Sequence, residues 1–313
     1  MKKIKILVIV VAFIFGLVYT LNLEYFARGI RIVYLNLETT VFIDDLKYFD
    51  YETIKSPLEK SPWAESKDKT TNFSTEFEEY NKKMRTAAYV VIQNDTIIGE
   101  KYYEDYSVNS STNSFSMAKT PVSLMMAKAF EQGYINSLED KVIDYIPELK
   151  GEFANDVKII DLAAMTSGID WDEGTSNPFS PVAKQYFYED LDKLMLDQKF
   201  ITEPSKTYKY SSANTQILSM VIEKATGMKT KDYFEKEFWF KINPDNDAYW
   251  QIDSKESGNV KSFCCLHSNA RDFSRLGKLY IDNGSWNGNQ IIDSTFIQKS
   301  TKPYLDDFRE YGI

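Results

Sequence analysis

The stretch from Met117 to Phe130 constrains the fold of this chain more than any other, because it is apolar on almost every side. Its apolar residues include Val122, Leu124, Met125, Met126, Ala127, Ala129 and Phe130. A helix without a polar face is buried in the interior of a protein. The run stops at Gly133, and glycine is typical of the residue that follows a helix. The sequence therefore predicts a buried helix and a folded domain around it.

The composition supports such a domain and narrows its partners. Hydrophobic residues make up 43% of the 313 residues, which is ample for the core of one large domain or two small ones. The formal net charge is −9, and no basic stripe occurs outside the extreme N-terminus. Nucleic-acid binding needs a concentrated basic surface. We therefore expect no nucleic-acid partner.

The N-terminus carries three lysines and then an uncharged, mostly apolar segment from Ile6 to Leu23. A helix needs about twenty apolar residues to span a bilayer. No small-x-small cleavage site follows the segment, which favours an uncleaved signal anchor over a cleaved signal peptide. We expect residues 1–24 to form a single-pass transmembrane helix, with its lysines cytoplasmic and the remaining chain extracytoplasmic. Secretion after signal cleavage is the alternative.

The segment from residue 25 to residue 84 is aromatic and charged with little periodicity, and we expect it to be a stalk or linker. It contains AESKDKTT, which is typical of a solvated linker. The predicted domain is residues 85–313. Two β-branched and aromatic runs, Ala87–Gln93 and Thr96–Tyr103, flank Asn94-Asp95 and predict a β-hairpin.

Helices are expected after this hairpin. VKIIDLAAMTSGIDW predicts a short helix ended by Gly168, TQILSMVIEKATG predicts a longer one ended by Gly227, and NARDFSRLGKLYIDN predicts a third. A hairpin followed by a helical middle indicates an α/β domain of the α+β type with an antiparallel sheet.

Ser116 and Lys119 lie at the start of the predicted buried helix. Side chains three residues apart share a helix face, so the lysine amine can reach the serine hydroxyl. A serine becomes a nucleophile when a base takes its proton, and burial lowers the pKa of a lysine toward the range where it is such a base. The alternative is a capped helix with a surface lysine. Spacing alone is weak, because Ser66 and Lys69 share it within AESKDKTT.

The start of this helix can be predicted in part. Ser114 or Asn113 is a suitable N-cap. Pro121 requires either that the regular helix begins later or that it bends. Further along, Tyr210 lies on a loop beside a lysine, and a neighbouring ammonium would lower the pKa of its phenol. Tyr210 is then a candidate general base or proton shuttle.

The only cysteines are Cys264 and Cys265 and the only histidine is His267. Neighbouring cysteines rarely bond to each other, so we expect two small buried residues and no disulfide framework. A Ser-His-Asp triad would need His267, and a zinc site would need further ligands. We expect His267 to be a surface residue or a satisfied core residue, and we expect no metal.

Three stretches, FSMAKT, DLAAMTSGIDWDE and YKYSSANTQIL, carry a resemblance to a known superfamily. Together and in this order they resemble the serine β-lactamases and penicillin-binding proteins, in particular the class C-like branch with the 6-aminohexanoate-oligomer hydrolases and related esterases. The resemblance runs from about Ala87 to the end of the chain. It implies a β-lactamase/transpeptidase-like fold, in which helices and a helical subdomain flank an antiparallel sheet.

The resemblance also implies roles for individual residues. Ser116 would be the acylated nucleophile, Lys119 its base and Tyr210 the proton-transfer partner. Ser212 takes the place of the asparagine of many β-lactamases and is a candidate substrate-binding residue. Trp171, with Glu173, would line the substrate pocket, or it would simply be a packed tryptophan.

We therefore expect a serine hydrolase that acts on a small-molecule amide or ester through an acyl-enzyme, without a cofactor. The alternatives are a D-alanyl-D-alanine carboxypeptidase and a catalytically inactive binding remnant. The third motif of the superfamily, a Lys/His-x-Gly triplet on a strand that also supplies an oxyanion-hole N–H, would lie beyond residue 313. We therefore expect the domain to be incomplete at its C-terminus. The sequence predicts no oligomeric state.

Overall fold

A computed structural model describes residue 20 and residues 23–175, 177–305 and 312–313. The described α-helices are α2 (Glu24–Ile32), α3 (Thr75–Lys83), α4 (Lys119–Glu131), α5 (Ile159–Ala163), α6 (Pro181–Phe187), α7 (Leu191–Leu196), α8 (Ser212–Thr226), α9 (Thr230–Phe234), α10 (Ala270–Ile281) and α11 (Ser294–Ser300). Shorter turns of helix are η1 (Tyr34–Asn36), η2 (Asp45–Tyr48), η3 (Phe115–Ala118), η4 (Val142–Asp144) and the π-helical η5 (Glu235–Trp239).

The described strands form three sheets. The first is antiparallel with the order β1 (Tyr51–Ile54), β6 (Ala248–Gln251), β7 (Leu266–Ser268) and β5 (Thr112–Asn113). In the second, β4 (Thr96–Tyr102) lies between β2 (Ala64–Thr70), which is parallel to it, and β3 (Ala88–Gln93), which is antiparallel. The third is the small hairpin of β8 (Ser285–Trp286) and β9 (Asn289–Gln290).

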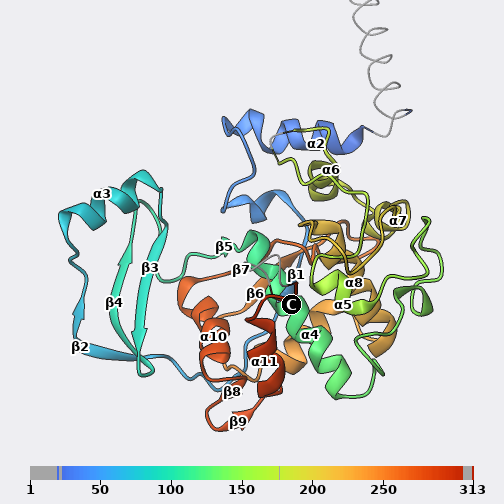
Figure 1. The fold of residues 1–313 in the computed structure, drawn as a ribbon. Helices are drawn as coiled ribbons and strands as arrows, with labels where there is room; N and C mark the ends of the chain where they lie inside the picture. The colour runs from blue at the N-terminus through green and yellow to red at the C-terminus, as the bar shows by residue number, and fades with distance from the viewer. Residues whose placement is uncertain (1–19, 21–22, 176, 306–311) are drawn as a thin grey trace, which may run out of the picture.

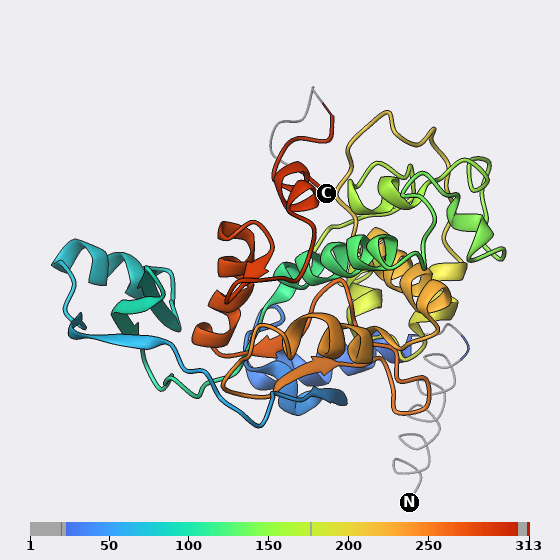
Figure 2. The same cartoon turned by 90° about the horizontal axis from the view of Figure 1, so that it is seen from below.

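The helix α4 runs through the middle of the molecule and packs on α8, as both views show (Figures 1 and 2). The unit of α3 and the second sheet lies to one side, next to α10. Ion pairs hold the two parts together, because Arg271 of α10 binds Glu65 of β2 and Glu100 of β4. The predicted hairpin therefore exists, but its strands belong to a separate sheet from the one beside α4.

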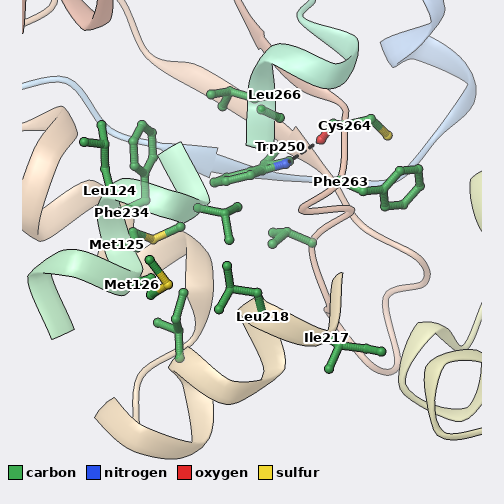
Figure 3. Packing of buried hydrophobic residues seen from close by; sticks show 14 of the residues in the cluster. Leu124, Met125, Met126, Ile217, Leu218, Phe234, Trp250, Phe263, Cys264 and Leu266 are labelled. Atoms are coloured by element: carbon green, nitrogen blue, oxygen red, sulfur yellow. Dashed lines mark hydrogen bonds between the residues drawn. The ribbon is translucent and has the colours of Figure 1, made fainter. Parts of the chain in front are cut away.

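The hydrophobic core lies between α4, α8 and the four-stranded sheet. Figure 3 shows side chains of Leu124 and Met125 from α4 facing Leu218 from α8 and Trp250 from β6. All four are at most 1% exposed. The prediction of a buried helix is therefore confirmed for most of α4, although Phe130 near its end is 45% exposed.

The ends and turns of the predicted elements can be compared with the structure. Asn94 and Asp95 both have positive φ angles, of 48° and 62°, as a tight hairpin turn requires. The helix α8 ends at Gly227, which is left-handed with φ 69°. Because α4 begins at Lys119, Pro121 falls in its first turn, where a proline costs no backbone hydrogen bond. The predicted N-cap is wrong, since Ala118 precedes α4 and no side chain caps it.

The segment predicted as a stalk or linker differs from that expectation. Its strand β1 pairs with β6 in the main sheet, and Ile32 and Ile54 are fully buried. AESKDKTT is an edge strand, β2, most of whose side chains are exposed, so it lacks the apolar alternation that would have revealed it. Ser66 and Lys69 thus lie on a strand, where Lys69 forms ion pairs with Glu65 and Glu100.

The predicted transmembrane helix, residues 1–24, lies almost wholly outside the described residues. Within the part of the chain that the structure describes, every helix is too short or too polar to cross a membrane.

The burial of β1 makes a prediction for stability. Replacing Ile54 by alanine should lower the free energy of unfolding by about 2–5 kcal/mol, because it removes a fully buried side chain. Urea unfolding of the full chain in detergent, followed by tryptophan fluorescence, measures this loss. Leu58 is 99% exposed, so Leu58→Ala is the matched control and should change the free energy by less than about 0.5 kcal/mol. Equal effects of the two changes would show that this segment does not fold with the domain.

Candidate active site

Ser116 lies on η3, just after the edge strand β5, and its side chain is exposed. The preceding residue, Phe115, has a left-handed backbone with φ 45°, which is uncommon for a bulky side chain. Its N–H donates a 2.8 Å hydrogen bond to Oδ1 of Asn113. This bond holds the turn that presents Ser116.

Asn113 is itself fixed by a buried network. Its Nδ2 donates to Oδ1 of Asp45 at 3.1 Å and to the hydroxyl oxygen of Tyr186 at 3.0 Å. Asp45 also accepts hydrogen bonds from the Tyr186 hydroxyl and, at 2.7 Å, from Nε2 of Gln251. Since Asp45 comes from η2 near the N-terminus, a residue far from Ser116 in the sequence supports the turn before it.

Lys119 is the first residue of α4 and its side chain is buried. Its Nζ donates to Oγ of Ser116 at 3.2 Å, to Oγ of Ser212 at 3.3 Å and to the main-chain oxygen of Phe263 at 2.7 Å. Burial lowers the pKa of Lys119 to about 8, against an opposing effect of the negative charge of Glu173. The spacing of Ser116 and Lys119 thus does bring base and hydroxyl together.

Ser212 begins α8 and connects Lys119 to Glu173. Its hydroxyl donates to Oε1 of Glu173 at 2.5 Å, and its main-chain N–H donates to Oε2 at 2.9 Å. The indole N–H of Trp171 also donates to Oε2 at 2.7 Å. Trp171 is 2% exposed, so it orients Glu173 from behind. A role of Ser212 and Trp171 in contacting substrate stays a prediction.

Tyr210 lies next to both Ser116 and Lys119. The Nζ of Lys119 is 5.0 Å from the centre of its ring, and the phenol shares a hydrogen bond with Ser116. Burial raises the pKa of Tyr210, the hydrogen bond to Ser116 lowers it, and the negative charge of Glu173 adds to the rise. The expected lowering of this pKa by a neighbouring ammonium is therefore wrong, because burial disfavours the phenolate and raises the pKa instead. Tyr210 is a neutral phenol that can donate a proton.

A cavity of about 430 Å³ opens over these three residues. Its walls are formed by Ser116, Lys119, Thr120, Ser123, Tyr210, Tyr280, Ser300, Gly312 and Ile313. Its volume is in the range of small-molecule sites. Ser212 and Trp171 lie outside this wall, behind Lys119.

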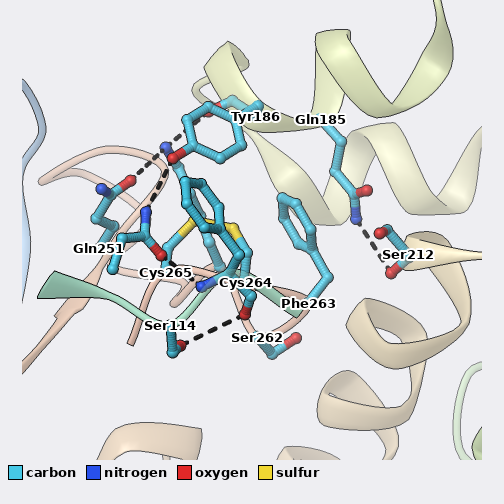
Figure 4. The surroundings of a disulfide bond; sticks show 12 residues. Ser114, Gln185, Tyr186, Ser212, Gln251, Ser262, Phe263, Cys264 and Cys265 are labelled. Atoms are coloured by element: carbon cyan, nitrogen blue, oxygen red, sulfur yellow. Dashed lines mark hydrogen bonds between the residues drawn. A yellow bond between two sulfur atoms is a disulfide. The ribbon is translucent and has the colours of Figure 1, made fainter. Parts of the chain in front are cut away.

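The two cysteines are joined in a disulfide, contrary to the prediction from their adjacent positions. Both are buried, as predicted, and Cys265 adopts a left-handed backbone with φ 70°. Figure 4 shows the pair next to Phe263, whose main-chain oxygen holds Lys119. The disulfide therefore belongs to the segment that positions the base.

His267 is a buried residue of β7, but it is not the satisfied core residue that the sequence predicted, because its Nδ1 has no hydrogen-bond partner among the described residues. Desolvation, with a smaller effect of Lys261, lowers its pKa to about 3, so the ring is neutral. Its Nε2 lies 3.1 Å from Nε2 of Gln251 and can only accept there. Within the described residues, its hydrogen bond joins it to Gln251 and not to Ser116. Among the described residues, no three His, Cys, Asp or Glu side chains are grouped to hold a metal ion.

The sequence did not predict that three residues would support Ser116 and Lys119. These residues are Asn113, Asp45 and Phe263. Asn113 was noticed only as a helix cap. Asp45 lies in a segment without periodicity, and Phe263 acts through its main chain, so neither gives a sequence signal. Glu173 was noticed as a residue of the pocket, but its position behind Ser212 depends on tertiary structure.

Comparisons with known proteins agree with this geometry. Residues 73–307 match the model of the beta-lactamase family. A 6-aminohexanoate-dimer hydrolase from Paenarthrobacter ureafaciens is 22% identical over 228 residues. That match covers 68% of this chain and 56% of the relative, so this chain spans little more than half the length of that protein.

Solved structures show the same fold. A candidate 6-aminohexanoate-dimer hydrolase from Bacillus anthracis has a TM-score of 0.73 and 21% identity, covering 83% of this chain and 73% of that one. A penicillin-binding protein from Bacillus halodurans has a TM-score of 0.59 and 15% identity, covering 75% and 82%. The structural likeness confirms the predicted fold class of antiparallel sheets with helices. With a family match over most of its length, the chain belongs to the beta-lactamase family.

Proposed function

We propose that this protein is a serine hydrolase that opens an amide or ester bond through an acyl-enzyme at Ser116. The observation that carries the proposal is the placement of Lys119. It is buried, its pKa is lowered to about 8, and it lies within hydrogen-bond distance of an exposed serine hydroxyl. A general base requires a lowered pKa and contact with the hydroxyl that it deprotonates, whereas a lysine with a purely structural role requires neither.

The arrangement supports a two-step reaction. The neutral amine of Lys119 takes the proton of Ser116, and Oγ attacks the carbonyl carbon of the substrate. Tyr210, a neutral phenol next to Ser116, passes a proton to the departing nitrogen or oxygen, which leaves as amine or alcohol. Water then attacks the ester of Ser116 and releases the acid. The phenolate left at Tyr210 takes the proton of this water, and the ammonium of Lys119 returns its proton to Oγ of Ser116 as the acid leaves.

The N-terminal sequence supports a location for this reaction. The apolar run from Ile6 to Leu23 and the lysines before it would anchor the chain in the cell membrane, with the hydrolase domain on the extracytoplasmic side. A substrate would then come from outside the cytoplasm.

The nucleophile can be tested by intact mass. After incubation with a fluorophosphonate, the full chain should gain the mass of one phosphonyl group, and Ser116→Ala should abolish this gain. Ser123 also lines the cavity, so Ser123→Ala is the matched control and should still be labelled. A folded protein that stays unlabelled would refute the proposal and favour a binding role. Labelling by a tagged penicillin would show that the site also accepts penicillin-type substrates.

The pH dependence of the rate reports on Lys119. Only the neutral amine is a base, so kcat/KM for a p-nitrophenyl ester should rise with pH and level off above about 8. Glu173→Gln removes a charge that raises the pKa of Lys119, so the midpoint should move to lower pH. The exposed neighbour provides a control, since Asp172→Asn should leave the midpoint in place. A midpoint that does not move, or that rises, would contradict the assigned roles.

The role of Tyr210 can be separated from that of Lys119. Tyr210→Phe should lower the rate on an alkyl amide by about 10²–10⁴-fold, because the amine cannot leave without a proton. The loss should be far smaller on a p-nitrophenyl ester, whose leaving group departs as a stable anion. Tyr208→Phe, a change on the same loop, should leave both rates close to those of the unchanged protein. Equal losses on the two substrates would mean that Tyr210 does not act as the proton donor.

A further inference from the structure

Exposed apolar side chains gather at one end of the molecule, around α2. Ile30 is 38% exposed, Tyr34 51%, Leu35 73%, Leu37 94% and Phe179 63%. Single exposed apolar residues are ordinary on a protein surface, but a contiguous group of large ones usually has a partner. We call these five residues the apolar rim.

The rim continues an apolar row along the chain. Leu23, Phe26 and Ile30 are three and four residues apart, so they follow one face of α2. Beyond the end of α2, Tyr34 begins η1 and Leu37 follows it with a left-handed backbone of φ 63°. This row begins where the apolar run from Ile6 to Leu23 ends. The rim is therefore joined directly to the segment that would enter the membrane.

A second segment extends the rim sideways. The ring of Phe179 stacks on that of Phe26, with 4.9 Å between their centres. Beneath it a cavity of about 450 Å³ lies between α2 and α6, and its lining includes Ile30, Val33 and Val182. The apolar surface thus continues inward as a pocket. Figure 1 shows α2 and α6 together at one end of the molecule, away from α10.

We propose that the apolar rim docks on the extracytoplasmic face of the lipid bilayer, so that the hydrolase domain lies against the membrane. Amphipathic segments of this kind bury their apolar side chains at the boundary of headgroups and acyl chains. Acyl chains can also fill the hollow between α2 and α6. A second copy of the chain is a poorer occupant, because a stable protein interface takes about 20–30 residues a side.

Bilayer contact can be measured on the full chain in liposomes. A cysteine at Leu37 carries a fluorophore, while the native cysteines are buried in their disulfide and do not react. Lipids with brominated acyl chains should quench this fluorophore. Ile281 is 80% exposed on α10 and is equally apolar, so Ile281→Cys is the matched control and should stay unquenched.

The rim itself is tested with a reporter at another of its residues. In a chain labelled through Phe179→Cys, brominated lipid should quench the fluorophore, and the added pair Leu35→Ser and Leu37→Ser should abolish that loss of emission.

Flotation of the liposomes in a density gradient separates this proposal from that of the N-terminal anchor. Chains that float with the liposomes but show no quenching at Leu37→Cys would overturn docking while leaving the anchor intact. Equal quenching at Leu37→Cys and Ile281→Cys would also overturn it. A third outcome would also overturn docking: aqueous iodide and brominated lipid both fail to quench the fluorophore at residue 37. A second copy of the chain would then cover the apolar rim.

Discussion

The burial of one amine, Nζ of Lys119, is the constraint on which the rest of the site depends. A buried ammonium must have its hydrogen bonds satisfied, and here Ser116, Ser212 and the main chain of Phe263 accept all three. These acceptors come from η3, from the start of α8 and from the loop before β7. The four-stranded sheet and the α4–α8 pair must therefore meet at this point for the lysine to be held.

A second buried group holds the nucleophile from the opposite side. The carboxylate of Asp45 is fully buried and accepts hydrogen bonds from Asn113, Tyr186 and Gln251. Desolvation raises the pKa of Asp45, and these donors oppose that rise. Removing a donor would leave part of a buried charge unsatisfied, which costs free energy. The hydrogen-bond network fixes Asn113, and through it the left-handed turn at Phe115. The segment before the family match is thus part of the site.

The residues that react could be predicted from the sequence better than the residues and strands that hold them in place. Ser116, Lys119 and Tyr210 could be recognised by their side-chain chemistry, because few residue types can serve as nucleophile, base or proton donor. The structure brings all three to one cavity. The burial of α4 followed from its composition. The place of β1 and β2 could not be predicted, since one is short and the other is a charged edge strand. The pKa of Tyr210 was misjudged, because burial of a side chain on a loop is a tertiary property.

Two opposing effects set the state of Lys119, and both come from parts of the chain that are distant in sequence. An amine with an ordinary pKa of 10.5 is neutral in roughly 0.03% of molecules at pH 7, whereas a pKa of about 8 makes it neutral in roughly a tenth. Glu173 works against this gain, yet it also fixes the hydroxyl and main-chain N–H of Ser212. Its charge therefore lowers the fraction of neutral amine at pH 7, while its hydrogen bonds to Ser212 help to fix the position of the amine. The amine must first take a proton and later return it. It therefore needs a pKa near the working pH, so that both proton transfers are possible, and a fixed position beside Ser116.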